Sequence, residues 1–122
     1  MSHLSSHFPE QLPGFDVAFG LKQCIGDQDL LVQLANRFWE DYAGFGAALE
    51  SDTDPANQMK RIHELKGVSI NLGFNDLSEM CARLRLKLNG GSHVEAEEWA
   101  RFRQELETVG SSIKTLDSQH RS

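Results

Sequence analysis

The sequence is short of cysteine and proline, and it contains no long hydrophobic run. Of its 122 residues, two are cysteine and three are proline. Cys24 and Cys81 lack the C-x-x-C spacing of a metal or redox site, so we expect reduced core thiols, as in a cytosolic protein. No apolar stretch approaches the roughly 18 residues that a membrane-spanning helix needs, and no secretory signal follows Met1. We therefore expect a cytoplasmic protein that makes no membrane contact of its own.

Positive charge is scarce as well. Lysine and arginine together number 12 against 18 aspartates and glutamates, which gives a formal net charge of -6. A protein that holds nucleic acid through its phosphates carries a basic surface. We therefore expect no nucleic-acid partner.

Motifs for nucleotides and metals are also missing. The sequence contains no G-x-x-x-x-G-K-[ST] loop and no glycine-rich loop that leads into a helix. No carboxylate cluster that could hold Mg²⁺ lies near the histidine discussed below. We therefore expect no bound cofactor, no metal site and no kinase activity of its own.

The length fits a single domain. Residues 1–14 contain serine, histidine and proline without any periodicity, and we interpret them as a flexible tail or linker. Residues 15–118 are expected to form the folded domain. A linker of this kind also raises the alternative that the chain is an excised domain of a longer protein.

The remainder of the chain is predicted to be helical. We expect a short helix over residues 16–24, followed by longer helices over 27–50, 55–72, 75–89 and from about residue 93 to 116. Asp27 and Asp54 are suitable N-caps, Pro55 suits a first helical position, and Gly73 suits a left-handed stop. The second helix has apolar residues at steps of three or four: Leu31, Leu34, Phe38, Tyr42, Phe45 and Leu49. These patterns predict an all-α protein, an antiparallel four-helix bundle with a short additional N-terminal helix.

The helix over residues 55–72 has two distinct faces. At 100° per residue, the buried stripe consists of Gln58, Ile62, Leu65, Ser69 and Leu72. His63 points away from this stripe, with Lys60 and Lys66 about 60° to either side. The other residues near His63 are Ala56, Met59, Gly67 and Ile70, joined by Phe74 if the helical turn continues that far.

A lone histidine on a helix is usually a solvated surface residue, but three features favour a functional site. Met59 and Ile70 place an apolar patch around His63 where a solvated face would be polar. Gly67 lies mid-helix, at a cost of about 1 kcal/mol relative to alanine, and close approach of a partner backbone would explain it. Lys66 adds a fixed positive charge one helical turn away from His63.

This combination suits phosphoryl transfer between proteins. A neutral imidazole is a nucleophile near pH 7, because the reference pKa of histidine is about 6.5. Lys66 can donate hydrogen bonds to the oxygens of a phosphoimidazole. Transfer needs little beyond in-line positioning and charge neutralisation, so a partner can supply both the donor and the metal.

The run His63-x-Leu65-Lys66-Gly67, followed by Asn71-Leu72-Gly73, resembles a histidine-containing phosphotransfer (HPt) domain. The segments Leu12-Pro13-Gly14-Phe15-Asp16-Val17-Ala18 and Gly26-Asp27-x-x-Leu30 resemble the entry of HPt domains at the C-termini of hybrid sensor kinases. The resemblance covers residues 12–116. It implies a helical bundle that carries phosphoryl groups in a multistep His–Asp phosphorelay, with His63 as phosphoacceptor, Lys66 stabilising charge and Gly67 giving clearance.

The resemblance also implies the partners. These are response-regulator receiver domains, which supply phospho-Asp and Mg²⁺, and a sensor or hybrid histidine kinase; the chain itself is expected to be a monomer. Receiver docking would use Met59, Gly67 and Ile70, with Lys60 at the rim and a contribution from the facing side of the second helix.

Ile70 departs from the family pattern, which often has Gly, Ala or Ser at this position on the histidine face. It could narrow the approach to His63 or add a contact that selects one receiver.

Two other functions stay open: a non-phosphorylated module that binds a receiver on the same face, and an unrelated bundle in which His63 is a general base. The basic run Arg83, Arg85 and Lys87 is either a solvated face or an electrostatic docking rim.

Overall fold

A computed structural model describes residues 8–121. In this range the chain is helical and contains no β-strand; part of the tail expected over residues 1–14, residues 1–7, lies outside the described residues. The helices are α2 (Val17–Gln23), α3 (Gln28–Tyr42), α4 (Phe45–Ser51), α5 (Pro55–Leu72), α6 (Asn75–Asn89) and α7 (Ala96–Arg121).

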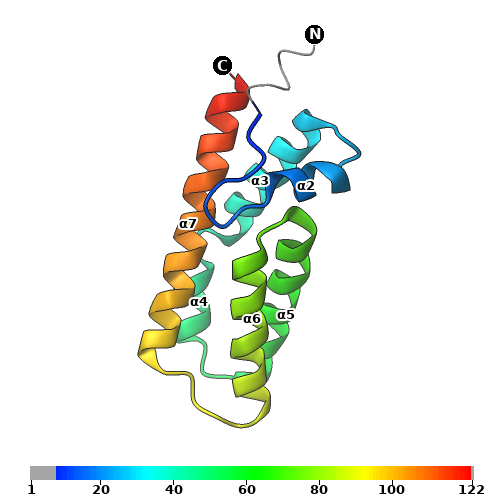
Figure 1. The fold of residues 1–122 in the computed structure, drawn as a ribbon. Coiled ribbons are helices and arrows are strands. Elements are labelled where there is room, and N and C mark those ends of the chain that lie inside the picture. Colours follow the sequence, from blue (N-terminus) through cyan, green and yellow to red (C-terminus); the bar gives the residue numbers. More distant parts are fainter. Residues whose placement is uncertain (1–7, 122) are drawn as a thin grey trace.

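The helices form an antiparallel bundle (Figure 1). The segment α3–α4 runs in one direction, α5 returns, α6 reverses again, and α7 spans the full length. The closest pair is the hairpin α5–α6, while both α3 and α4 pack against α7. The short helix α2 packs against α5 and α3 at one end. The predicted four-helix bundle with a short additional helix is therefore confirmed.

The second helix was predicted as one element over residues 27–50, and this was wrong. It ends at Tyr42 and resumes at Phe45, because Gly44 leaves the helical conformation at φ -97°, ψ 11°. After this interruption, α4 packs closely against α7. A Cβ added to Gly46 of α4 would lie 2.7 Å from Cγ of Arg103 on α7. Leu34 was also misassigned to the core and is 41% exposed.

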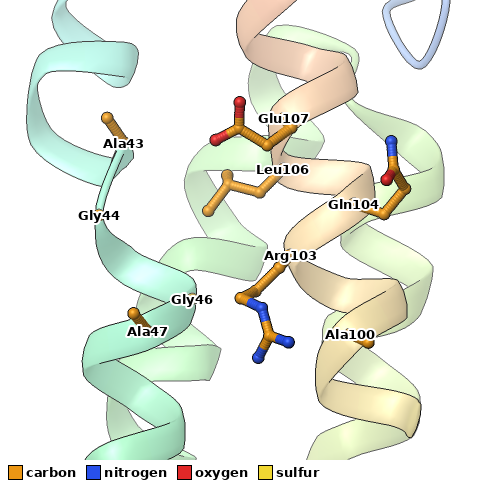
Figure 2. Close-up of a pocket in the computed structure, with 9 residues that line it drawn as sticks. All are labelled: Ala43, Gly44, Gly46, Ala47, Ala100, Arg103, Gln104, Leu106 and Glu107. Atoms are coloured by element: carbon orange, nitrogen blue, oxygen red, sulfur yellow. The ribbon is translucent and has the colours of Figure 1, made fainter.

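The break leaves an open groove between α4 and α7 (Figure 2). Small residues form its α4 side, and the charged Arg103 on α7 is paired with Glu50. Its lining consists of Ala43, Gly44, Gly46, Ala47, Ala100, Arg103, Gln104, Leu106 and Glu107.

The turn between α5 and α6 follows from Gly73. Its φ is +94°, and its N–H bonds back to the Ile70 carbonyl while the next N–H, of Phe74, bonds to the Ser69 carbonyl, as in a Schellman motif. Phe74 consequently does not join the His63 face, as a continued helix would have required. It is fully buried, with its ring centroid 4.7 Å from those of both Phe15 and Phe38.

Residues 8–15 lie against the bundle. Leu12 and Phe15 exchange two backbone hydrogen bonds across a tight turn at Pro13 and Gly14, and the Ser112 hydroxyl donates to the Pro13 carbonyl. The division into a tail of residues 1–14 and a domain of residues 15–118 stays a prediction. At the other end, α7 continues to Arg121.

The core agrees with the other sequence expectations. Trp99 is 6% exposed, and Cys24 and Cys81 are buried without a disulfide. Trp39, whose exposure the sequence left open, is partly buried, and its indole covers Gly110 of α7. No helix within residues 8–121 is long and apolar enough to span a membrane.

One carboxyl group opposes folding at neutral pH. Oε2 of Glu105 is buried beside Gly14 and has no hydrogen-bond partner within residues 8–121. Burial, and secondarily the charge of Asp76, raises the pKa of Glu105 above its ordinary value of 4.5. The folded state therefore favours the protonated form.

We predict that Glu105→Gln stabilises the protein more at neutral than at acidic pH. Below pH 4.5 the wild-type carboxyl is protonated in both states, so no penalty applies; the penalty develops as pH rises from 4.5 through the higher folded-state pKa. Urea unfolding of both proteins at several pH values measures the difference. Glu107→Gln, on the exposed side of the same helix, is the control. A stability gain that does not change with pH would contradict this assignment.

Candidate functional site

His63 lies near the middle of α5 and is exposed to solvent. The predicted buried stripe is confirmed, since the buried residues of this helix are Gln58, Ile62, Leu65, Ser69 and Leu72. Gln58 explains why a polar residue belongs to the stripe. Its side-chain amide donates to the carbonyls of Leu49 and Asp52, both at 2.8 Å, and so ties the start of α5 to the end of α4.

His63 faces an open groove between α5 and α6, which we call the His63 groove. Its lining consists of Met59, Lys60, His63, Lys66, Ala82, Arg85, Leu86 and Asn89. The last four form the α6 wall. The α5–α6 turn explains this pairing: His63 lies ten residues before Gly73 and Arg85 twelve after it, so both stand roughly 15 to 18 Å along their helices from the turn.

The structure brings four of the six sequence-predicted residues together in this groove: Met59, Lys60, His63 and Lys66. Gly67 and Ile70 are exposed on the same helix, but they do not line the groove. The wall opposite His63 comes from α6. The contribution expected from the second helix to docking stays a prediction.

The groove is positively charged. Lys60, Lys66 and Arg85 form no ion pair within residues 8–121, and none of the eight lining residues is acidic. Two other cations of α5 and α6 are held in ion pairs. Lys87 pairs with Glu98 at 2.6 Å and Arg61 with Asp52 at 3.6 Å.

Lys66 is close enough to α6 to act on its interior. Burial raises the pKa of the Cys81 thiol to about 12, and the positive charge of Lys66 acts in the opposite direction. The side chain of Lys66 is itself partly buried. A cation held beside the groove can neutralise an anion on His63 at little additional entropic cost.

Sequence reasoning missed the α6 wall. It considered Arg85 only as one member of a basic run and did not consider Ala82, Leu86 or Asn89. The wall residues recur at a helical spacing of three and four, on a face next to the buried residues Leu77, Cys81 and Leu84. This spacing can be read from the sequence. The sequence did not reveal that Lys87 is paired with Glu98 while Arg85 has no ion pair in the part of the chain that the structure describes.

Gly67 has no packing reason within the described chain. A Cβ added to Gly67 would meet nothing within 4 Å, whereas one added to Gly110 would overlap the Trp39 ring. Gly110 is therefore a glycine required by the fold. Gly67 leaves open space on the exposed side of α5, near His63.

No group of three or more His, Cys, Asp or Glu residues that could hold a metal ion occurs within residues 8–121. The site therefore consists of an accessible imidazole, three cations from two helices and open space beside the imidazole.

The chain matches the family model of the Hpt domain over residues 28–112. This range is more than half of the chain, which therefore belongs to the Hpt domain family. Members of this family are phosphotransfer modules that act as carriers in His–Asp phosphorelays and interact with response-regulator receiver domains. No curated protein and no solved structure matches the chain.

We predict opposite effects of alanine at two mid-helix glycines. Gly67→Ala should leave stability unchanged or raise it by up to about 1 kcal/mol, because alanine is the better helix former and has room. Gly110→Ala should destabilise by about 1–3 kcal/mol, because the methyl group must displace the Trp39 indole. Denaturant unfolding of both variants measures the difference. Marked destabilisation by Gly67→Ala would show an internal reason for this glycine.

Proposed function

We propose that this Hpt domain accepts a phosphoryl group from a receiver-domain aspartate on His63 and passes it to another receiver. The observation that carries the proposal is the placement of His63, exposed on α5 in a groove with three cations that have no ion-pair partner in the described chain. An accessible nucleophile beside fixed positive charge is what a phosphoryl carrier requires.

The reaction follows from the imidazole. A ring nitrogen of neutral His63 attacks the phosphorus of the receiver's phospho-Asp, the N–P bond forms, and the P–O bond to the aspartate breaks. The carboxylate leaves as an anion, and the proton on the other ring nitrogen can pass to solvent. The receiver supplies Mg²⁺. The return reaction, to a second receiver, reverses these changes.

The neighbouring residues have separate roles. Lys66 donates to the phosphoryl oxygens and stabilises their charge, and Lys60 stands at the rim. Gly67 keeps the space beside His63 clear. Met59 and Ile70, which is 46% exposed, contribute apolar contact area for the receiver.

We further infer the setting of the domain. A sensor or hybrid histidine kinase stands upstream, and the chain works in the cytoplasm as a monomer, without nucleic acid or membrane contact. It has no kinase activity, because ATP is used by the upstream enzyme.

A second candidate function is a non-phosphorylated module that binds a receiver on the same face. The exposed Ile70, close to His63 on the helix wheel, is the feature that favours it, because a bulky side chain there could obstruct in-line transfer. Incubation with a phosphorylated receiver separates the two functions. A carrier acquires acid-labile, base-stable label, and a binding module does not.

We predict that His63→Gln abolishes phosphoryl acceptance and leaves the fold intact, because an exposed side chain contributes little to stability. Lys66→Ala should slow transfer at least about tenfold without abolishing it, since Lys66 stabilises charge but is not the nucleophile. Transfer from a phosphorylated receiver is measured with radiolabel, alongside thermal unfolding. ATP alone should label neither protein. Label on another histidine in the His63→Gln variant would refute the assignment.

The Ile70→Ala variant tests whether Ile70 packs against the receiver or obstructs its approach to His63. If Ile70 packs against the receiver, its truncation should weaken binding by about 1 kcal/mol or more, roughly fivefold in Kd, and we expect this outcome. The physical reason is that an exposed isoleucine beside the site gains stability only when a partner covers it. Titration of wild type and variant against a panel of receivers is the measurement. Unchanged binding with faster transfer to several receivers would instead indicate obstruction.

A further inference from the structure

The α6 wall contains an exposed apolar residue that folding does not explain. Leu86 is 73% exposed, although it lies on a helix whose core contact is already made by Leu77, Cys81 and Leu84. A single exposed leucine is common on a soluble protein. Leu86, however, lines the same groove as His63, so anything that reaches the imidazole also approaches this leucine.

Arg85 adds a charge beside Leu86. Its neighbour in the run, Lys87, is held by Glu98, whereas Arg85 has no ion pair within residues 8–121 and lines the groove. The chain as a whole carries a net charge of -6. A groove with three cations and no acidic lining residue is therefore a local positive region that can orient an acidic partner.

The size of protein interfaces extends the contact onto α6. A stable interface buries about 800 Å² on each partner and involves about 20 to 30 residues per side. The exposed residues of α5 around His63 are too few for this. A receiver seated over the imidazole must therefore also cover a neighbouring helix, and the α6 wall is the surface that shares the groove.

We propose that Leu86 and Arg85 form a second contact for the receiver and that this contact determines which receiver binds. The partner is a receiver with an apolar depression and an acidic residue beside its phospho-Asp. His63 and Lys66 then provide the chemistry common to every donor, whereas α6 provides the selectivity. This inference rests on the proposed phosphoryl-carrier function of His63.

The test uses Leu86→Ala and Arg85→Gln, with Ile25→Ala as the matched control. Ile25 is 95% exposed and does not line the groove. The probes are the receiver domains encoded in the source genome, phosphorylated with acetyl phosphate, and phosphoramidate as a small donor that needs no docking. Receiver Kd, transfer rate and His63 labelling by phosphoramidate are measured for all four proteins.

Leu86→Ala is expected to weaken binding of the preferred receiver at least about fivefold. Arg85→Gln should weaken it by a similar factor and reduce the salt dependence of association. Leu86→Ala should retain wild-type labelling by phosphoramidate, and Ile25→Ala should behave as wild type throughout.

Wild-type receiver affinity in both α6 variants would overturn this inference while leaving the carrier function intact. An equal loss of affinity in Ile25→Ala would overturn it too, because the effect would not be specific to α6. If neither receivers nor phosphoramidate label His63 in the wild type, the carrier function itself fails. Each failure is thus distinguishable from the others.

Discussion

The left-handed turn at Gly73 is the constraint on which the site depends. A side chain at this residue would be strained at φ +94° and would overlap the backbone carbonyl of Asp16. The Gly73 carbonyl accepts the Asp16 N–H at 2.8 Å, so the turn also fixes the start of α2. Because the turn is this short, α5 and α6 lie antiparallel with their registers fixed. His63 and Arg85 become neighbours for that reason.

The second determinant of the site is the distribution of ion pairs. The protein is acidic overall, and many of its cations are held by carboxylates, such as Arg61 by Asp52 and Lys87 by Glu98. The three cations of the His63 groove are not held in this way within the described residues. A site for an anionic group thus arises in an acidic chain because three such cations share one groove that no acidic side chain lines.

Local signals in the sequence predicted most of the fold. The predicted caps Asp27 and Asp54 each accept a backbone N–H at the start of their helix, and α5 and α6 have the expected bounds. The break at Gly44 was not predicted, because a glycine lowers helix stability only slightly and neighbouring contacts decide whether the helix continues. The close packing of Gly46 on Arg103 and the aromatic contact between Tyr42 and Phe45 occur in the bent arrangement.

The sequence by itself determined the face of α5 that carries His63, Lys66 and Gly67, since helical periodicity depends only on residue spacing. It also determined where that helix ends, because only glycine readily adopts the conformation of Gly73. The tertiary structure decided which helix forms the opposite wall, which cations stay without an ion pair and whether space is open above Gly67. These properties depend on contacts between residues far apart in the chain, and no local pattern encodes such contacts.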